Sequence, residues 1–567
     1  MDDSARSETS TSDEKLSSPQ PSKNELAISQ LPPDSDSSPK VHHEQQPNDQ
    51  SQYVTGYKLA IIVATVSLSC FLMLLDTMII GTAIPRITDT FHSLTDVGWY
   101  ASAYQFGSAA PQLLTGKIYT RFSTKWTFLV FLGIFELGSV LCGAAVSSRM
   151  LIVARAVAGM GAAGITTGAI TIISSCAPLE KRPALIGYLT GFNQLGLVAG
   201  PLIGGAFTSY TTWRWCFYVN IPVGAVAAVA IALLHIPEQT TKASPLSVLR
   251  RLHHYLDLVG FVLFAPAVLQ LLLALQYGGN VYAWNSSQVI GLFCGSAATS
   301  VVWIFWNYSR GKDASLPFSL IGQTAVWTSG IYQALIQTAI YGIIYFLPIY
   351  FQAVDNASPM LSGVYLLPTI LSQLVMAVSS GKIMSTIGYA LPSAIFSTVF
   401  LSVASGLYSL LGPNSPVGEW IGFQIIGGIG SGAGLQVAIV AVQAVIKGPE
   451  LPSAMAFLVC VQFLGPAIAL ALYNVIFDTS LRSQLTQKAP HLNATAIIDS
   501  GATGFRDQVQ PSDLPPLLSA YATSIDRVFY LVTGLSAARI ICLWGMGWHD
   551  IRKKKPSVDP ETTNDGK

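Results

Sequence analysis

The sequence predicts an all-α, polytopic membrane protein, and three observations support this fold class. Of the 567 residues, 51% are hydrophobic and 11% are charged, whereas soluble domains carry about 25% charged residues. The mean hydropathy is +0.48. The apolar residues gather in runs of about 20, the length of a helix that crosses a bilayer. No run sustains the alternation of a β-strand, so the spans are expected to be helical.

About fourteen apolar runs are predicted to cross the membrane. They lie at 58–80, 96–115, 126–146, 150–173, 184–207, 215–236, 258–277, 288–308, 327–351, 361–380, 390–411, 419–445, 454–477 and 526–547. Lys and Arg concentrate in alternate loops, such as 116–125 and 242–251, while "NVYAWNSS" and "GPNSPVGEW" contain neither. Because positively charged loops stay on the cytoplasmic side, both termini are predicted to be cytoplasmic.

The polar end of the chain differs from the apolar middle. Residues 1–55 are rich in Ser, Asp, Glu, Pro and Gln and are predicted to form a disordered cytoplasmic tail. They lack the basic start and apolar core of a signal peptide, so the first span is expected to act as its own anchor. The seven cysteines are scattered, with no CxxC pair. This favours buried thiols over disulfides, and no metal site is expected.

Three sequons for N-glycosylation fall on the predicted outer side, at Asn285, Asn356 and Asn493. The triplet occurs by chance in many proteins, so location decides among them. Asn493 lies in the long outer loop at 478–525 and is therefore the favoured acceptor.

The stretch "QLGLVAGPLIGG" at 194–205 contains residues that a helix interior normally avoids. Gly196, Gly200 and Gly204 are spaced i, i+4 and i+8, so they line one face of the fifth span. Small residues at this spacing let two helix backbones approach closely in lipid, and Pro201 is expected to bend the helix. The stretch, with Gly205, is interpreted as a gating or packing motif; ordinary small-residue packing is the alternative.

Three ionisable residues at membrane depth are candidates for proton coupling. Asp76 lies in the first span, Glu136 in the third and Arg155 in the fourth. Such residues are costly in lipid and mark functional sites by default. A carboxyl group balanced between burial and a nearby arginine can take up and release a proton. The alternative is a static ion pair that only holds helices together.

Several motifs resemble those of the major facilitator superfamily, in its fungal 14-span drug:H⁺ antiporter branch. They are "GLVAGPLIGG" at 196–205, "LDTMIIGTAIPRI" at 75–87, "LIVARAVAGMGAAG" at 151–164, "WRWCFYVNIPVG" at 213–224 and "YFLPIYFQAVDNASPMLSGVYLLP" at 345–368. The resemblance covers roughly residues 56–550. It implies a role in proton transfer for Arg155, and a role in substrate or proton linkage for Asp76.

The resemblance also implies the domain organisation of that fold. Two six-helix halves are expected, at 56–237 and 327–548, the second containing the long extracellular loop. Residues 238–326 would form a cytoplasmic linker and two inserted spans, the seventh and eighth. Residues 549–567 would form a cytoplasmic tail.

One motif departs from the family pattern GxLaDRxGRK, at "GKIYTRFSTK", residues 116–125. Gly116, Arg121 and Lys125 are kept, but Thr120 stands where the family has an Asp. In the family this Asp helps to latch the two halves together on the cytoplasmic side. The latch is therefore in question in this chain.

In the superfamily fold the substrate cavity lies between the two halves, near the membrane midplane. Polar and aromatic residues on the expected cavity-facing spans are Tyr104, Gln105, Asn193, Gln194, Gln333, Gln337, Tyr341 and Tyr365, with Gln373, Gln436 and Gln462 as further members. This mixture carries little charge and suits bulky, amphipathic, roughly neutral molecules. The alternative for each residue is a hydrogen bond between helices.

These features together predict a secondary transporter that exports hydrophobic or amphipathic small molecules, such as a secondary metabolite, toxin or drug, in exchange for protons. No phosphate-binding GxxxxGK[ST] loop occurs, so neither ATP nor another cofactor is expected. The net charge of +1 predicts no nucleic-acid partner. A monomer in the plasma membrane is expected, with the vacuolar membrane as the alternative. A proton-coupled uptake permease of the same fold, such as a siderophore transporter, is the other functional hypothesis, and a membrane enzyme is disfavoured.

Overall fold

A computed structural model describes residues 53–552 apart from 92–96, 239–241, 243–255, 280–281, 491, 493–496, 498–504 and 508. The chain divides into two compact units, 1–51 and 52–567, and every described residue belongs to the second. This unit is helical. Among its described residues the only β-type pairing is an isolated bridge between Gly278 and Tyr282.

The first half of the bundle comprises α1 (Tyr57–Phe91), α2 (Val97–Ala109), α3 (Gln112–Arg121), α4 (Thr124–Gly143), α5 (Ser148–Cys176), α6 (Arg182–Tyr210), α7 (Trp215–Tyr218) and α8 (Asn220–Leu233). It is followed by α11 (Leu258–Tyr277), α12 (Ser287–Arg310), η3 (Gly311–Asp313) and α13 (Phe318–Ile321).

The second half comprises α14 (Thr324–Ala353), α15 (Pro359–Val364), α16 (Leu367–Ile387), α17 (Leu391–Tyr408), α18 (Val417–Gly434), α19 (Val437–Val445), η4 (Gly448–Glu450), α20 (Leu451–Lys488), η5 (Phe505–Asp507), α23 (Leu514–Ala538) and α24 (Ile540–Met546).

By length and composition, twelve helices in the described part of the chain could cross a membrane. The two other predicted spans fall on the α2–α3 pair and on α6, which is 29 residues long. The count of fourteen and the cytoplasmic location of both termini stay predictions.

Several predicted spans are broken or extended in the structure. The span at 96–115 divides into α2 and α3 at Pro111, because proline lacks the backbone N–H and crowds the preceding turn. The loop expected at 478–525 is shorter than predicted, since α20 continues to Lys488 and α23 begins at Leu514. Buried Leu481 and Leu485 extend the apolar face of α20 into the core, which explains the longer helix.

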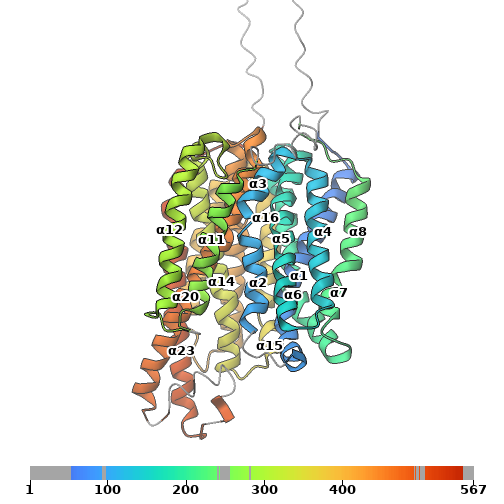
Figure 1. The fold of residues 1–567 in the computed structure, drawn as a ribbon. Helices are drawn as coiled ribbons and strands as arrows, with labels where there is room; N and C mark the ends of the chain where they lie inside the picture. Colours follow the sequence, from blue (N-terminus) through green and yellow to red (C-terminus); the bar gives the residue numbers. More distant parts are fainter. Residues whose placement is uncertain are drawn as a thin grey trace, which may run out of the picture. The chain divides into compact units, whose positions relative to one another are not determined.

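The helices pack as two groups that meet where α6 packs on α16 and α3 packs on α20, and an inserted pair lies between the groups in sequence (Figure 1). In the first group α1 packs on α6 and α5 packs on α4 and α2. In the second, α18 packs on α16 and α17, and α20 packs on α14 and α23. The inserted helices α11 and α12 pair with each other, and α11 also contacts α2 and α20.

Two large hydrophobic cores hold the bundle. One lies within the second group. The other is formed mainly by the first group but includes Ile439 and Val442 of α19 and Met455 of α20. The two halves are therefore joined near the predicted cytoplasmic ends of these helices.

Candidate functional site

A buried ion pair joins α1 to α5 and brings together two of the three candidate intramembrane charges. Arg155 Nη1 pairs with Asp76 Oδ2, and the two side chains are 1% and 0% exposed. Arg155 Nε donates to the Tyr100 carbonyl at 3.0 Å, and its guanidinium carbon lies 4.5 Å from the Tyr104 ring centroid. The buried guanidinium thus has a carboxylate, a backbone carbonyl and an aromatic face around it, and such further contacts are what offset the cost of burying an ion pair.

Asn220, which the sequence reasoning did not single out, completes this site. Its Nδ2 donates to Asp76 Oδ1 at 3.1 Å and to Ser139 Oγ at 3.1 Å. Asn220 begins α8 and lies inside the motif "WRWCFYVNIPVG". A polar amide within an otherwise apolar predicted span was the signal that could have identified it. Both oxygens of Asp76 therefore have a donor.

Glu136 is not part of the ion pair. It lies one turn before Ser139 on α4 and faces α8, where a Cβ on Gly224 would be 1.8 Å from Glu136 Oε1. Among the described residues, neither carboxyl oxygen of Glu136 has a hydrogen-bond partner. A buried carboxyl group without a donor is far more costly when ionised than when protonated.

The glycine stripe of α6 packs against α1, the helix that contains Asp76. A Cβ at Gly200 would lie 2.6 Å from Met78 Cβ, and one at Gly196 would lie 2.9 Å from Leu75 N. Gly204 is equally close to α1, whereas a Cβ at Gly205 would meet nothing within 4 Å. The stripe therefore permits a close approach of two backbones, as predicted. Residue 201 lies within the helix, and the Pro201 side chain lies outside the described part of the structure.

A cavity of about 150 Å³ lies between the two groups of helices, and we call it the central cavity. Six of the predicted substrate residues line it: Asn193, Gln194, Gln333, Gln337, Tyr341 and Gln462. The described residues that line it include none with a charged side chain. Asn193 Oδ1 and Gln333 Oε1 are buried without a hydrogen-bond partner in the described structure, so each can accept a bond from a ligand.

A second cavity, of about 550 Å³, lies between α2, α11, α14 and α20, and we call it the side cavity. Gln105, predicted to face substrate, lines this cavity and not the central one. Tyr341, Gln462 and Phe463 line both cavities.

Two predicted cavity residues lie elsewhere, which corrects their placement. Tyr104 packs under Arg155, as described above, because its face of α2 turns toward α5. Tyr365 follows α15 and packs against Phe351 and Trp420, each with a centroid distance of 5.1 Å. Neither tyrosine lines the central or the side cavity. Helix rotation, which sequence periodicity alone does not fix, decides which neighbour each ring meets.

Two glutamines from the wider prediction also lie outside both cavities. Gln436 donates to the Ala377 carbonyl and to Ser380 Oγ, each at 2.9 Å. Gln373 is fully buried. The bond from α18–α19 to α16 therefore supports the alternative reading of Gln436, a hydrogen bond between helices.

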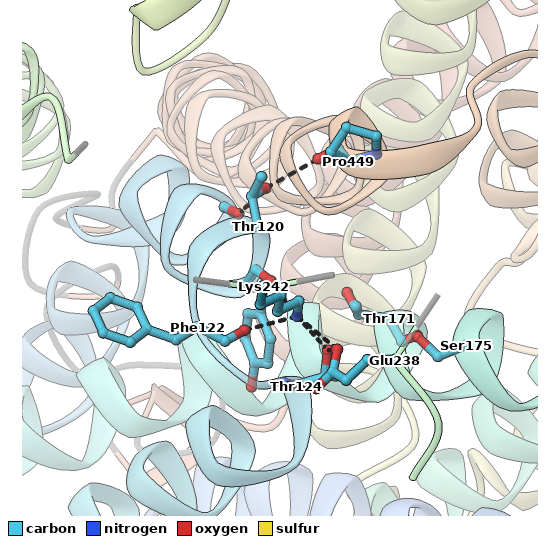
Figure 2. A network of polar contacts seen from close by, with 10 residues as sticks. Thr120, Phe122, Thr124, Thr171, Ser175, Glu238, Lys242 and Pro449 are labelled. Carbon is cyan, nitrogen blue, oxygen red and sulfur yellow. Dashed lines mark hydrogen bonds and ion pairs between the residues drawn. The ribbon is translucent and has the colours of Figure 1, made fainter. Parts of the chain in front are cut away.

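The motif at 116–125, which differs from the family pattern, still lies at a contact between the two halves. A Cβ on Gly116 would lie 2.8 Å from Ala456 Cβ and 2.9 Å from Ser453 Cα, so α3 and α20 touch at this glycine. The Thr120 hydroxyl lies 3.2 Å from the Pro449 carbonyl of η4 (Figure 2). It also lies 2.8 Å from the Gly116 carbonyl. A neutral hydroxyl thus occupies the place of the family carboxylate.

Charged contacts around this loop come from the segment that follows α8. Glu238 accepts bonds from Thr124 N at 2.6 Å and Thr124 Oγ1 at 2.9 Å. Lys242 Nζ lies 2.8 Å from Glu238 Oε2 and donates to the Phe122 carbonyl at 2.7 Å (Figure 2). It also donates to the Tyr119 carbonyl at 3.0 Å. The end of α3 and the start of α4 are therefore both capped from outside the motif.

The capping contacts perturb the titration of Glu238. Burial raises the pKa of its carboxyl group, but the bonds from Lys242 and Thr124 outweigh burial and hold the pKa below the ordinary value of 4.5.

Lys125, a predicted motif residue, donates to the Ala232 and Leu234 carbonyls at 2.6 and 2.8 Å. It caps α8 and does not bridge the two halves. Arg121 is partly buried at the end of α3.

The same end of the bundle carries a direct hydrogen bond between the halves. Gln443 Nε2 on α19 donates to Ser174 Oγ on α5 at 2.9 Å. Together with the α3–α20 contact and the shared core, this bond closes the predicted cytoplasmic end of the central cavity.

The remaining predicted sites are peripheral. Asn285 and Asn356 are exposed, and Asn356 has a positive φ of 56° in the turn between α14 and α15. Asn493 lies outside the described residues. Of the described residues, no three His, Cys, Asp or Glu side chains form a group that could hold a metal ion.

Comparisons with known proteins give consistent matches. The family model described as Major Facilitator Superfamily matches residues 66–470. The MFS-type transporter pigP of Monascus ruber is 52% identical over 92% of this chain and 91% of its own. The efflux pump mlcE of Penicillium citrinum is 44% identical over 94% of this chain and 99% of its own.

Among solved structures, the proton:xylose symporter XylE aligns with a TM-score of 0.55 at 12% identity, covering 87% of this chain and 98% of that one. At this identity the match concerns the fold alone. The fold class predicted from the sequence is confirmed.

Proposed function

The chain belongs to the major facilitator superfamily, and from this premise we propose that it exports uncharged, hydrophobic or amphipathic small molecules in exchange for protons. The proposal rests on one observation above all. The central cavity between the halves has no charged lining residue among those described. Two of its amide oxygens, Asn193 Oδ1 and Gln333 Oε1, have no hydrogen-bond donor in the described structure. Such a surface is suited to small molecules that are mostly apolar and carry a few hydroxyl or amide groups.

The named relatives support the direction of transport. The Penicillium citrinum protein mlcE and the Monascus pilosus protein mokI are both called efflux pumps. For this chain we infer the same direction, and a secondary metabolite or toxin as cargo. The proposed location is the plasma membrane, and the proposed acting unit is a monomer without cofactor or catalytic activity.

Proton coupling is assigned to the Asp76–Arg155 pair. When Asp76 takes up a proton, the attraction that holds α1 to α5 is lost, and Arg155 remains as an uncompensated buried cation. The helices then gain free energy by moving apart or by admitting water. Because the α6 glycines pack directly on α1 around Met78, a displacement of α1 would be transmitted to α6, which lines the central cavity.

The experiment measures transport in sealed inside-out vesicles with an acid interior. A panel of neutral hydrophobic toxins and drugs is offered to the wild type, to Asp76→Asn and to Asp550→Asn. Asp550 provides a matched control because it also pairs with an arginine, Arg552, at 2.7 Å, but both side chains are exposed. We expect uptake that is lost only in Asp76→Asn.

Three other outcomes are informative. Equal transport in all three proteins would leave export intact and remove Asp76 from coupling. No proton-dependent movement of any compound would contradict the export proposal. Accumulation in whole cells, with no uptake by inside-out vesicles, would favour the uptake permease.

A further inference from the structure

We propose that the side cavity is a second binding site for the same uncharged, amphipathic molecules, a vestibule between the central cavity and the outer half of the bilayer. This inference rests on the proposed function and adds a role for the inserted helix α11. The wall of the side cavity is formed by α2, α11 and α20. Tyr341 and Tyr345 of α14 complete this wall.

The size of the side cavity fits a ligand better than the central cavity does. Small-molecule sites have volumes of about 300–1,000 Å³. The side cavity, at about 550 Å³, lies in this range, while the central cavity, at about 150 Å³, lies below it. In this conformation a drug-sized molecule can therefore be held in the side cavity, whereas the central cavity would have to expand first.

The lining of the side cavity points to an amphipathic ligand. Gln105, Gln276 and Asn474 contribute amide groups, and Leu272 and Leu275 contribute an apolar wall. The described lining residues include no Asp, Glu, Lys, Arg or His. Amide side chains are costly against hydrocarbon and usually face a polar interior at membrane depth. Together with Gln462, these amides surround one apolar wall and can bind the polar groups of a neutral ligand.

The two cavities meet at a hydrogen bond. Gln462 lines both cavities, and its Oε1 accepts from Gln333 Nε2 at 2.9 Å. This bond joins α14 to α20 between the two spaces, and Tyr341 and Phe463 flank it. A ligand group that replaces the bond could pass from one cavity to the other without leaving an amide unpaired.

The place of α11 indicates which side the vestibule serves. Residues Leu275 and Gln276 lie in the last turn of α11, and Ile84 lies in the last third of α1. Both helix ends are predicted to be extracellular, whereas the opposite end of the bundle is closed by the Gln443–Ser174 bond. The side cavity therefore lies on the exit path of an exporter.

Aromatic contacts fix α11 at this position. The Trp99 ring on α2 packs edge-on against Tyr277 at the end of α11, with centroids 5.9 Å apart. Trp99 also packs against Phe106, a lining residue of the side cavity, at 5.9 Å. The inserted helix, which belongs to neither half, thus forms the wall of the side cavity between α2 and α20.

The test is photolabelling of the full-length protein in lipid nanodiscs with benzophenone, a neutral aromatic probe, followed by mass spectrometry of peptides. Diphenylmethane, its unreactive analogue, competes for any saturable site. We expect competed labelling of the segments around Gln105, Leu275 and Ala471. Labelling of the lipid-facing surfaces should not be competed.

Two matched pairs of variants locate the site. Leu275→Trp fills the cavity from α11, while Leu273→Trp, on a neighbouring partly exposed position outside the lining, serves as its control. Ala471→Trp fills it from α20, and Leu472→Trp, at a position 51% exposed, is the second control. Each protein is first checked for a single monodisperse peak. Competed labelling should fall at least tenfold in the two cavity variants only.

The outcomes separate this inference from the proposed function. If competed labelling is absent from the side cavity, or persists in both cavity variants, the vestibule is refuted even when export is intact. If labelling behaves as expected but no compound is transported, the site stands and the export proposal fails. If both hold, Leu275→Trp should slow export more than Leu273→Trp does.

Discussion

Asp76→Asn should destabilise the folded protein strongly, and the reason is the charge that it leaves behind. Arg155 is 1% exposed, and Asp76 is the carboxylate with which it pairs. The asparagine keeps an oxygen for the bond from Asn220, which donates to Asp76 Oδ1 at 3.1 Å in the wild type. The substitution therefore removes the negative charge with little change in volume.

The expected magnitude follows from the burial of the pair. Removing one partner of a fully buried ion pair costs about 3–5 kcal/mol, because the other charge stays buried without compensation. Replacing both charges by neutral groups is much less costly and is often neutral. The double variant Asp76→Asn/Arg155→Gln should therefore recover about 1–3 kcal/mol relative to Asp76→Asn.

The assay is the free energy of unfolding from denaturant titration in detergent, for the two single variants and the double variant. Asp550→Asn, which removes an exposed partner of Arg552, should be unchanged. A double variant as unstable as the sum of its parents would refute the reasoning, since the two charges would then be independent. So would an Asp76→Asn protein within about 0.5 kcal/mol of the wild type.

Three further predictions concern packing and titration. Gly200→Ala should destabilise the folded protein by about 1–3 kcal/mol, because its Cβ would lie 2.6 Å from Met78 Cβ. Gly205→Ala should not destabilise it, because a Cβ there meets nothing within 4 Å. Thermal unfolding of the two variants tests this difference. Because the folded pKa of Glu238 lies below 4.5, Glu238 stabilises the fold above that pH and the gain is lost as pH falls through the folded value. Glu238→Gln should therefore lower stability at neutral pH and weaken its loss in acid, which thermal unfolding at a series of pH values would detect. Glu136, whose carboxyl oxygens have no described partner, is expected to be protonated, so Glu136→Gln should remove a protonated-carboxyl band from the infrared spectrum; an unchanged band would contradict this.

Much of the fold could be predicted because the bilayer acts on each segment separately. A span must satisfy its own backbone hydrogen bonds and present apolar side chains over about 20 residues, so run length and composition are sufficient to locate it. The breaks at Pro111 and the extension of α20 to Lys488 were harder to foresee. They depend on local proline chemistry and on core contacts beyond the membrane.

The candidate site was only partly predictable. Its charged members were identified because ionisable residues in apolar runs are conspicuous, and the face of the glycine stripe followed from helical periodicity. The assignment of Tyr104 to substrate was not supported, since its ring packs on Arg155. The sequence did not predict that Asn220 belongs to the site, because a single amide in an apolar run does not reveal its hydrogen-bond partner.

The sequence by itself determined the all-helical membrane fold class, the motifs of the family and the set of intramembrane charges. The tertiary structure alone decided that Asp76 meets Arg155, 79 residues away, and Asn220, 144 residues away. It also decided that the Glu136 carboxyl oxygens have no hydrogen-bond partner among the described residues and that polar residues line two cavities. Composition and periodicity are local properties, whereas a pairing between helices depends on how each helix is rotated and how closely it packs. Those variables are set jointly by side chains distributed over the whole chain.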